Sequence, residues 1–234
     1  MRNHQLYAVV TGDIVGSTRI RGSPRDRLLS VVKSSFQGLR HAISGKVSAP
    51  FGLYRGDSFQ GVLSRPEDAL RAVICIRASL RCGLQEGPKN YPLDARIVVG
   101  IGTIEFLPSR RAAEGDGDAF RRSGPMLDKM RRAQPRLRKL LIQTPWKEID
   151  AELDVHCALL DALVNRWSVK QAEAILGQMR GLTQEKIAQE LGISQPAVQQ
   201  RLEDAGGWAA GELCGRYERL IRDGTSVVAY NRHQ

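Results

Sequence analysis

Residues 7–18 read YAVVTGDIVGST, an apolar run that leads to an acidic residue, a glycine and two hydroxyl residues. The apolar run is typical of a buried strand, and we expect it to deliver the carboxylate of Asp13 to the end of that strand. Mg²⁺ prefers such oxygen ligands. Gly16, Ser17 and Thr18 then form a loop whose N–H and O–H groups are suited to phosphate. The alternative is a plain strand followed by an ordinary Asp/Gly turn.

A second acidic position follows in residues 52–63, which read GLYRGDSFQGVL. This pattern predicts two strands joined by a tight turn, with Arg55 and Asp57 at the tip. Gly-Asp is a common hairpin turn, so a plain hairpin is one interpretation. The other is that Asp13 and Asp57 share one or two divalent ions, as carboxylates do in two-metal phosphoryl-transfer sites.

The motifs DIVGST and RGDSF, in this order, resemble the catalytic domain of class III nucleotide cyclases. Residues 95–106 resemble the central strand and glycine turn of that family, and residues 117–120 resemble the entry to its catalytic helix. The resemblance implies that Asp13 and Asp57 hold Mg²⁺ or Mn²⁺ together with a bound triphosphate. The whole chain resembles the SatD-type group of small bacterial proteins, which join such a domain to a helix-turn-helix.

The sequence departs from this family where catalysis is concentrated. The resemblance puts Arg121 where an active cyclase has asparagine, and Pro125 where it has arginine. Arg121 or Arg122 is a substitute for the phosphate-binding guanidinium, whereas Pro125 is expected to start or break the helix. Leu53 stands in the neighbourhood of the usual purine-reading lysine. We therefore assign no catalytic residue and expect a domain that binds a nucleotide, or a related polyphosphate, better than it cyclises one.

The predicted nucleotide contacts come from the first strand and its loop, the hairpin tip and the late helix. They are Asp13, Ile14, Gly16, Ser17, Thr18, Arg55, Asp57, Arg121 and Arg122, with Asp13 and Asp57 also predicted to bind the metal.

The order of predicted elements gives an α+β chain. Residues 1–143 are expected to form a ferredoxin-like, palm-type βαββαβ domain. Residues 144–167 are a connecting helix, with Thr144 as N-cap and Pro145 at the first helical position. Residues 168–234 are expected to form a helix-turn-helix domain.

Composition limits the other possibilities. The 234 residues are 42% hydrophobic, which suffices for a core, and they contain no apolar run long enough for a membrane span. The start of the chain lacks the apolar stretch of a signal peptide, and the four scattered cysteines have no metal-type spacing. We therefore expect a cytoplasmic protein.

The net charge of +10 invites a polyanionic partner, but it is unevenly distributed. Residues 1–143 carry 25 Lys and Arg against 12 Asp and Glu, whereas residues 144–234 carry 10 against 13. The basic half is thus the cyclase-like half. Its basic runs are interpreted either as a phosphate-binding surface or as a solvated helix face.

Residues 181–202 read GLTQEKIAQELGISQPAVQQRL, which is the strongest motif in the chain. The spacing predicts two short helices around a glycine turn, as in a DNA-reading helix-turn-helix. A helical hairpin used only for folding or dimerisation is the alternative. The predicted DNA contacts are Thr183, Ser194, Gln195, Gln199, Gln200 and Arg201.

Together these motifs predict a nucleotide-responsive DNA-binding transcriptional regulator with a degenerate cyclase-like domain. Double-stranded DNA and a second copy of the chain are its expected partners. The alternative is an active nucleotide cyclase or nucleotidyltransferase that uses a divalent metal on Asp13 and Asp57. A third interpretation is a purely structural or interaction module.

Overall fold

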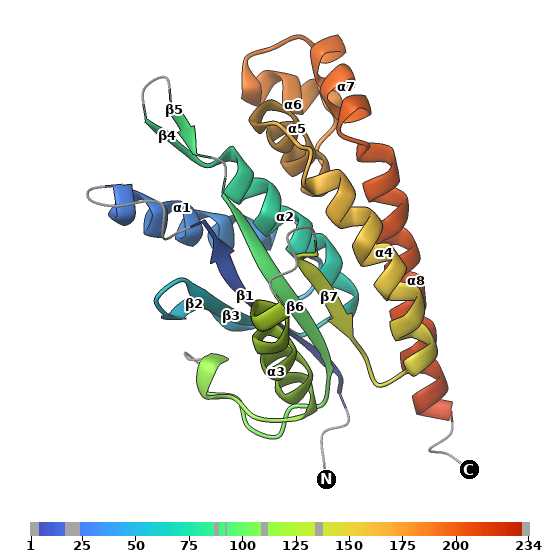
Figure 1. Ribbon diagram of the computed structural model, residues 1–234. Coiled ribbons are helices and arrows are strands. Elements are labelled where there is room, and N and C mark those ends of the chain that lie inside the picture. The colour runs from blue at the N-terminus through green and yellow to red at the C-terminus, as the bar shows by residue number, and fades with distance from the viewer. Residues whose placement is uncertain are drawn as a thin grey trace.

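The computed structural model describes residues 5–16, 24–86, 89–91, 93–108, 112–133 and 138–230. A five-stranded sheet with strand order β2-β3-β1-β6-β7 lies at its centre (Figure 1). These strands are β1 (Tyr7–Val15), β2 (Val47–Arg55), β3 (Ser58–Leu63), β6 (Asp94–Gly102) and β7 (Leu140–Gln143). β4 (Leu84–Glu86) and β5 (Lys89–Tyr91) pair with each other as a separate antiparallel sheet.

The central strand β1 is antiparallel to both of its neighbours, β3 and β6. Its near-continuous burial agrees with the apolar run in the sequence, since a central strand is covered on both faces. β7 extends the sheet in parallel with β6, and it is an element that the sequence did not predict. Asp13 therefore lies inside β1, two residues before its end, and not at the terminus.

One face of the sheet is covered by α1 (Pro24–Gly38) and α2 (Ala69–Cys82), each flanked by a short 3-10 turn, η2 (Leu39–His41) and η3 (Pro66–Asp68). Alternate side chains of β1, such as Ala8, Val10 and Ile14, belong to the core on this side. α2 is buried around most of its circumference because helices from the C-terminal part of the chain cover its other side.

The opposite face is covered by α3 (Asp118–Ala133) and the turn η4 (Ala112–Glu114). α3 approaches β6 so closely that a Cβ atom at Gly100 would lie 2.1 Å from the carbonyl oxygen of Ala119. Glycine is therefore required there for the helix to lie on the strand. Pro125 does not break α3 as predicted. Pro125 and Arg121, four residues earlier, are both exposed, so water can solvate the carbonyl that lacks a helical donor.

The C-terminal helices are α4 (Lys147–Val164), α5 (Val169–Met179), α6 (Gln184–Leu191), α7 (Gln195–Asp204) and α8 (Gly207–Tyr230). Figure 1 shows α4 and α8 as a long pair beside the sheet, with α5 to α7 at one end. Their buried side chains join the same core cluster as those of α1, α2 and the sheet. The division into domains at residues 143 and 167 stays a prediction.

α4 begins later than predicted, with Trp146 in place of Thr144 at the N-cap. Thr144 Oγ1 instead accepts a hydrogen bond from Trp146 N at 2.9 Å and donates one to Trp146 O at 3.0 Å, which closes a turn before the helix. Among the described residues, no helix combines the length and apolarity needed to span a bilayer.

A buried ionic cluster fastens the sheet to the flanking helices. Arg77 of α2 is fully buried and donates to both carboxylate oxygens of Asp94 in β6, at 2.9 and 3.1 Å. Its remaining Nη1 donates to Asp161 of α4. Lys139, just before β7, donates from Nζ to Asp94 at 2.8 Å. Each buried charge thus has partners of opposite sign, the condition under which charges are tolerated in a core.

Candidate functional site at the β1–β3–β6 end

Asp13 is 1% exposed, and the cross-strand pairing of β1 sets its surroundings. Its direct neighbours are Arg96 in β6 and Ser58 in β3. Directly paired residues project to the same face of an antiparallel sheet. The register therefore brings a carboxylate, a guanidinium and a hydroxyl together on the face that α3 covers.

Two arginines compensate the charge of Asp13. Arg96 makes a two-pronged contact, with Nε 3.2 Å from Oδ1 and Nη2 2.8 Å from Oδ2. Arg131, in the last turn of α3, places Nε 3.6 Å from Oδ2. Arg131 is 43% exposed and Arg96 22% exposed, so both guanidinium groups also face solvent.

Asp57 lies at the tip of the β2–β3 hairpin, after Gly56 with a φ of 58°. Its backbone carbonyl accepts a hydrogen bond from Ile14 N at 3.1 Å, which ties the tip to β1 next to Asp13. The Asp13 and Asp57 segments therefore lie side by side as predicted, although Asp13 lies inside β1 and not at its end. Ligand binding by Asp13 and Asp57 stays a prediction.

The electrostatics of Asp13 are unfavourable for its ionised form. Burial raises the pKa of Asp13, the charges of Arg96 and Arg131 oppose this only in part, and the nearby charge of Asp57 raises it further. A carboxyl whose pKa is raised by folding stabilises the protein only while it is protonated. This contribution to the free energy of unfolding is lost as the pH rises through the folded-state pKa. Ionised Asp13 therefore lowers the free energy of unfolding.

We expect Asp13→Asn to raise the melting temperature at pH 7, because the amide keeps the shape without the buried charge. At this chain length, each ~1 kcal/mol corresponds to about 2–4 °C. Calorimetry should show the largest gain above the raised folded-state pKa and a vanishing gain below about pH 3.9, the ordinary pKa of aspartate. Asp128→Asn on the exposed face of α3 is the control. A lower melting temperature for Asp13→Asn at pH 7 would contradict the prediction.

A row of buried polar side chains continues from Asp13 under α3. Gln60 Nε2 donates to Thr11 Oγ1 at 2.8 Å, and Thr11 Oγ1 is 3.0 Å from Ser123 Oγ. Because these groups satisfy one another, they fix α3 against the sheet and thereby position Arg131.

The other predicted contacts of the first strand and hairpin are only partly placed. Ile14 is buried in the core on the α1 side of the sheet, so it contributes packing there. Gly16 has a φ of 87°, as a turn glycine does. Ser17 and Thr18 lie outside the described residues, as does the side chain of Arg55.

Arg121 and Arg122 are not brought to Asp13. They lie in the first turns of α3, near the end of β6 at Gly102, whereas Arg131 at the other end of α3 reaches Asp13. Ten residues of α-helix span about 15 Å. Arg121 pairs instead with Glu105, Asp116 and Asp118, and Arg122 lies 3.9 Å from Asp118. The structure thus separates these two arginines from the predicted site.

A divalent metal does not fit the side chains as they are arranged. Both oxygens of Asp13 already face Arg96, and Mg²⁺ requires oxygen ligands at about 2.0–2.1 Å. No three His, Cys, Asp or Glu side chains within the described ranges gather to hold a metal ion. The conditional prediction of Mg²⁺ or Mn²⁺ at Asp13 and Asp57 would therefore require Arg96 to move.

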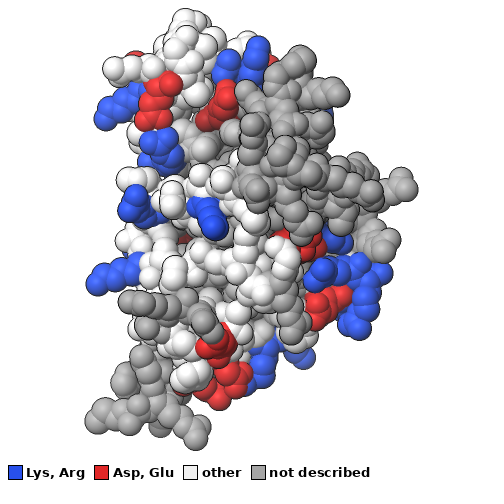
Figure 2. Space-filling view, turned by 90° about the vertical axis from the view of Figure 1, so that its left-hand side faces the viewer, with Lys and Arg blue, Asp and Glu red and all other residues white. Residues whose placement is uncertain are grey.

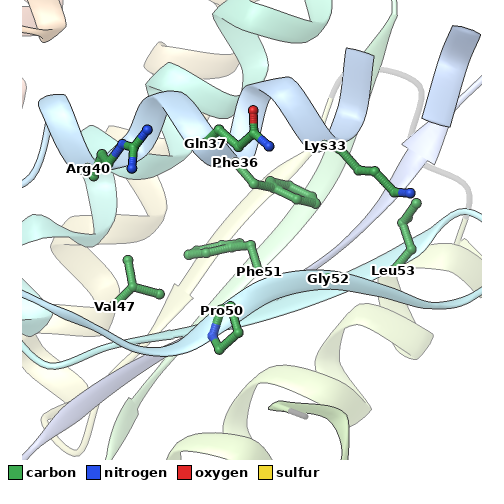
Figure 3. Close-up of a pocket in the computed structure, with 9 residues that line it drawn as sticks. All are labelled: Lys33, Phe36, Gln37, Arg40, Val47, Pro50, Phe51, Gly52 and Leu53. Carbon is green, nitrogen blue, oxygen red and sulfur yellow. The ribbon is translucent and has the colours of Figure 1, made fainter. Parts of the chain in front are cut away.

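A cavity of about 560 Å³ lies between α1 and the edge strand β2 (Figure 3). The rings of Phe36 and Phe51 form its walls, with centroids 5.4 Å apart. Lys33 extends from α1 toward Leu53 at one end of the cavity. The remaining lining residues are Gln37, Arg40, Val47, Pro50 and Gly52.

The predicted DNA-contact residues surround the turn between α6 and α7. Gly192 has a φ of 63°, and Thr183 caps α6 by accepting from Lys186 N. Ser194 is the N-cap of α7, but its side chain makes no cap hydrogen bond. Two helices around a glycine turn were thus predicted correctly as local structure.

The polar side chains of α7 are, however, engaged within the protein. Gln199 donates to Glu203 and Gln200 to Asp204. Gln195 donates to Gln184, and Arg201 pairs with Glu173 at 3.3 Å. Residues 183–204 carry four acidic and two basic side chains. This charge balance supplies little of the phosphate neutralisation on which non-specific DNA affinity depends.

The basic surplus does not gather into a single patch on the face seen in Figure 2. Among the described residues there, Lys and Arg side chains lie in small groups with Asp and Glu beside several of them. The interpretation as a solvated, mixed surface fits this face better than a continuous phosphate-binding surface does.

Arg96 and Arg131 were not predicted as site residues. A charged residue in the otherwise apolar segment Ala95–Ile101 is a local signal for Arg96, because a buried strand rarely carries an unpaired arginine. Arg131 is one of several arginines in a basic run, and only the packing of α3 distinguishes it from exposed Arg132.

No family model matches the chain, and no curated protein matches it significantly. Several solved structures are similar. One is the active GGEEF domain of a diguanylate cyclase from Vibrio cholerae, with 20% identity, a TM-score of 0.41, and coverage of 61% of this chain and 85% of that one.

Two further similar structures are of a diguanylate cyclase and a GGDEF domain. The diguanylate cyclase SiaD from Pseudomonas aeruginosa, in complex with its activator SiaC, is 19% identical with a TM-score of 0.44, over 59% of this chain and 50% of that one. The GGDEF domain of DgcB from Caulobacter crescentus, in complex with c-di-GMP, is 13% identical with a TM-score of 0.39, over 59% and 77%.

These findings correct the main functional prediction. All three similar structures are of diguanylate cyclases or their domains, and none is of a DNA-binding regulator. The internal pairing of the α7 side chains agrees with this outcome. The interpretation as a DNA-binding transcriptional regulator is therefore corrected. The individual contacts assigned to Thr183, Ser194, Gln195, Gln199, Gln200 and Arg201 are not tested by these findings.

Proposed function

We propose that this chain is a nucleotide-binding protein of the cyclase type, which holds the phosphates of its ligand at the Asp13–Asp57 end of the sheet. The observation that carries the proposal is the convergence of Arg96 and Arg131 on Asp13, beside the tip of the β2–β3 hairpin. Two partly exposed guanidinium groups offer the forked N–H donors that suit phosphate oxygens. Asp13 holds both in place.

The proposal includes a ferredoxin-like core and membership of the SatD-type group. The support for the core is the order β2-β3-β1-β6 with antiparallel neighbours, crossed by α1 and α2. The support for the group is the combination of this core with the α6–α7 pair.

The base of the nucleotide is proposed to occupy the cavity between α1 and β2. Leu53 lines the cavity and pairs with Phe59, which is two residues from Asp57. Along a strand this separation is about 7 Å, so the cavity lies near the hairpin tip. Arg96 and Arg131 lie on the opposite, α3-covered face, so the nucleotide is proposed to pass around this end of the sheet. Phe36 and Phe51 provide aromatic surface for a base, and stacking contributes about 1–3 kcal/mol. Leu53 on β2 stands near the usual position of the purine-reading lysine, and Lys33 of α1 is proposed to supply that positive charge instead.

We propose that α5 to α7 serve packing, because Ile187 and Val198 join the main core and Arg71 of α2 donates to Met179 O and Glu218. The homodimer predicted from the sequence is retained as a proposal. Val155 and Leu159 support it, since they lie one turn apart on α4 and are each 58% exposed.

Calorimetric titration of the full chain with ATP, GTP, cyclic di-GMP and inorganic tripolyphosphate tests the proposal. We expect at least one nucleotide to bind. Phe51→Leu should weaken its binding about tenfold, the scale of one lost stacking contact, while leaving tripolyphosphate unaffected. Arg131→Gln should weaken both ligands, whereas Arg132→Gln, one residue along the same helix, should weaken neither. Absence of nucleotide binding under all conditions would refute the proposed function.

Nucleotide cyclisation or nucleotidyl transfer at the same place is the second candidate. The observation that favours it is that Asp13, near the end of β1, lies next to the hairpin tip that carries Asp57, since phosphoryl-transfer sites use neighbouring carboxylates. Incubation with each triphosphate and Mn²⁺, followed by chromatography for cyclic products and released diphosphate, tests it. Turnover that Asp13→Ala abolishes would establish the activity.

A further inference from the structure

Contacts within the sheet already occupy the carboxylate of Asp13 and leave it inaccessible to a metal ion. Arg96 contacts both of its carboxylate oxygens, and the Asp13 side chain is only 2% exposed. Arg131 adds a second positive charge 3.6 Å from Oδ2. A divalent cation at Asp13 would have to displace the guanidinium fork of Arg96 and tolerate the charge of Arg131.

The contact between Arg96 and Asp13 is fixed by strand register and is not a chance surface pair. The two residues are direct partners in the β1–β6 ladder, which pairs every residue from Tyr7 to Val15. A slip of one residue would turn all the core side chains of β1 to the wrong face. The register therefore keeps Arg96 beside Asp13 in the folded chain, within reach of its carboxylate.

We infer that Arg96 keeps divalent metal ions off the Asp13–Asp57 pair, and that this end of the sheet binds phosphate groups through Arg96 and Arg131 without a metal. Asp13 is then a buried counter-ion that positions the two guanidinium groups. The choice of phosphate as ligand rests on the proposed function, whereas the exclusion of metal does not.

The metal half of the inference is tested without any nucleotide. Mn²⁺ is titrated into the full-length protein and free Mn²⁺ is followed by electron paramagnetic resonance. The wild type should bind no Mn²⁺ at Asp13, so Asp13→Asn should leave its Mn²⁺ binding unchanged. Arg96→Gln should strengthen Mn²⁺ binding about ten- to hundredfold, the scale on which neighbouring groups alter metal affinity. The double variant Arg96→Gln with Asp13→Asn should lose this gain, and Arg132→Gln should resemble the wild type.

Circular dichroism checks that Arg96→Gln is folded, and Arg96→Lys is the second variant, which keeps a charge but not the fork. Arg96→Lys should also admit more Mn²⁺ than the wild type, because an ammonium group covers one carboxylate oxygen and not both. Wild-type Mn²⁺ binding that Asp13→Asn abolishes, or folded Arg96 variants with unchanged Mn²⁺ affinity, would overturn the inference.

The phosphate half is tested by titrating tripolyphosphate in the presence of EDTA. Binding in EDTA that Arg131→Gln weakens about tenfold supports the inference. Binding that requires Mg²⁺ overturns it. If no polyphosphate or nucleotide binds but Arg96→Gln gains Mn²⁺, the proposed function fails while the exclusion of metal stands.

Discussion

Arg77→Met is expected to lower the free energy of unfolding by about 3–5 kcal/mol, the cost of removing one partner from a buried ion pair. Arg77 is fully buried, and it is the residue that links Asp94 of β6 to Asp161 of α4. Methionine fills part of the space but leaves Asp161 without its cation. Since a domain is typically stable by about 5–15 kcal/mol, this loss is a large fraction of the total.

Urea unfolding at pH 7 measures the effect as a shift of the midpoint. Arg180→Met is the matched control, because Arg180 pairs with Glu190 at 2.9 Å on the surface. Exposed pairs contribute only about 0–1 kcal/mol. The double variant Arg77→Met with Asp161→Asn should recover part of the loss. An Arg77→Met protein within ~1 kcal/mol of the control would contradict a structural role for the buried cluster.

The same cluster gives the stability a definite pH dependence. Burial alone would raise the pKa of Asp94, but the charges and hydrogen bonds of Arg77 and Lys139 outweigh it and hold the pKa well below its usual range. A lowered pKa contributes stability that is present above about pH 3.9 and is lost as the pH falls toward the folded-state value. In Arg77→Met the acid-side loss attributable to Asp94 should therefore be smaller than in the wild type.

Gly100→Ala is expected to destabilise the protein by about 3 kcal/mol, at the upper end of typical overpacking costs. The added Cβ would lie 2.1 Å from Ala119 O and 2.8 Å from Ser123 N, both backbone atoms of α3. Backbone cannot rotate aside as a flexible side chain does, so the helix must move away from β6. Because α3 carries Arg131, we also expect weaker tripolyphosphate binding, by about tenfold for one lost charged contact.

Gly38→Ala is the matched control for the same substitution. Gly38 has helical angles of −67° and −21°, and nothing lies within 4 Å of a Cβ added there. Alanine should stabilise this position by ~0.4–1 kcal/mol through the unfolded chain. Thermal unfolding compares the two variants. Equal effects of the two substitutions would exclude a close approach of α3 to β6 as the cause.

Some features of the candidate site depend on residues close together in the sequence, and others depend on residues far apart in it. The approach of the Asp13 and Asp57 segments follows from two short motifs, since an apolar strand and a Gly-Asp turn each have a strong local pattern. Arg121 was predicted from its position in a motif, but its charge is taken by three carboxylates in the folded chain. A motif position does not reveal which charges will lie nearby.

In the C-terminal segment, too, local features were predictable from the sequence and side-chain partners were not. The Thr183 cap and the Gly192 turn were predicted from spacing alone, because capping and positive φ depend on neighbouring residues. Spacing did not reveal that Arg201 pairs with Glu173, 28 residues away, or that Gln199 and Gln200 donate to acidic residues of α7 itself. Side-chain availability depends on partners from other elements.

The sequence by itself determined the buried strand β1, the hairpin with Asp57 at its tip and the paired helices α6 and α7, because these features depend on contacts between near neighbours. Only the tertiary structure decided that Arg96 and Arg131 close over Asp13, and that Arg77 joins α2 to β6 and α4. Those contacts join residues far apart in the chain, and they form only when strand register and helix packing are both fixed.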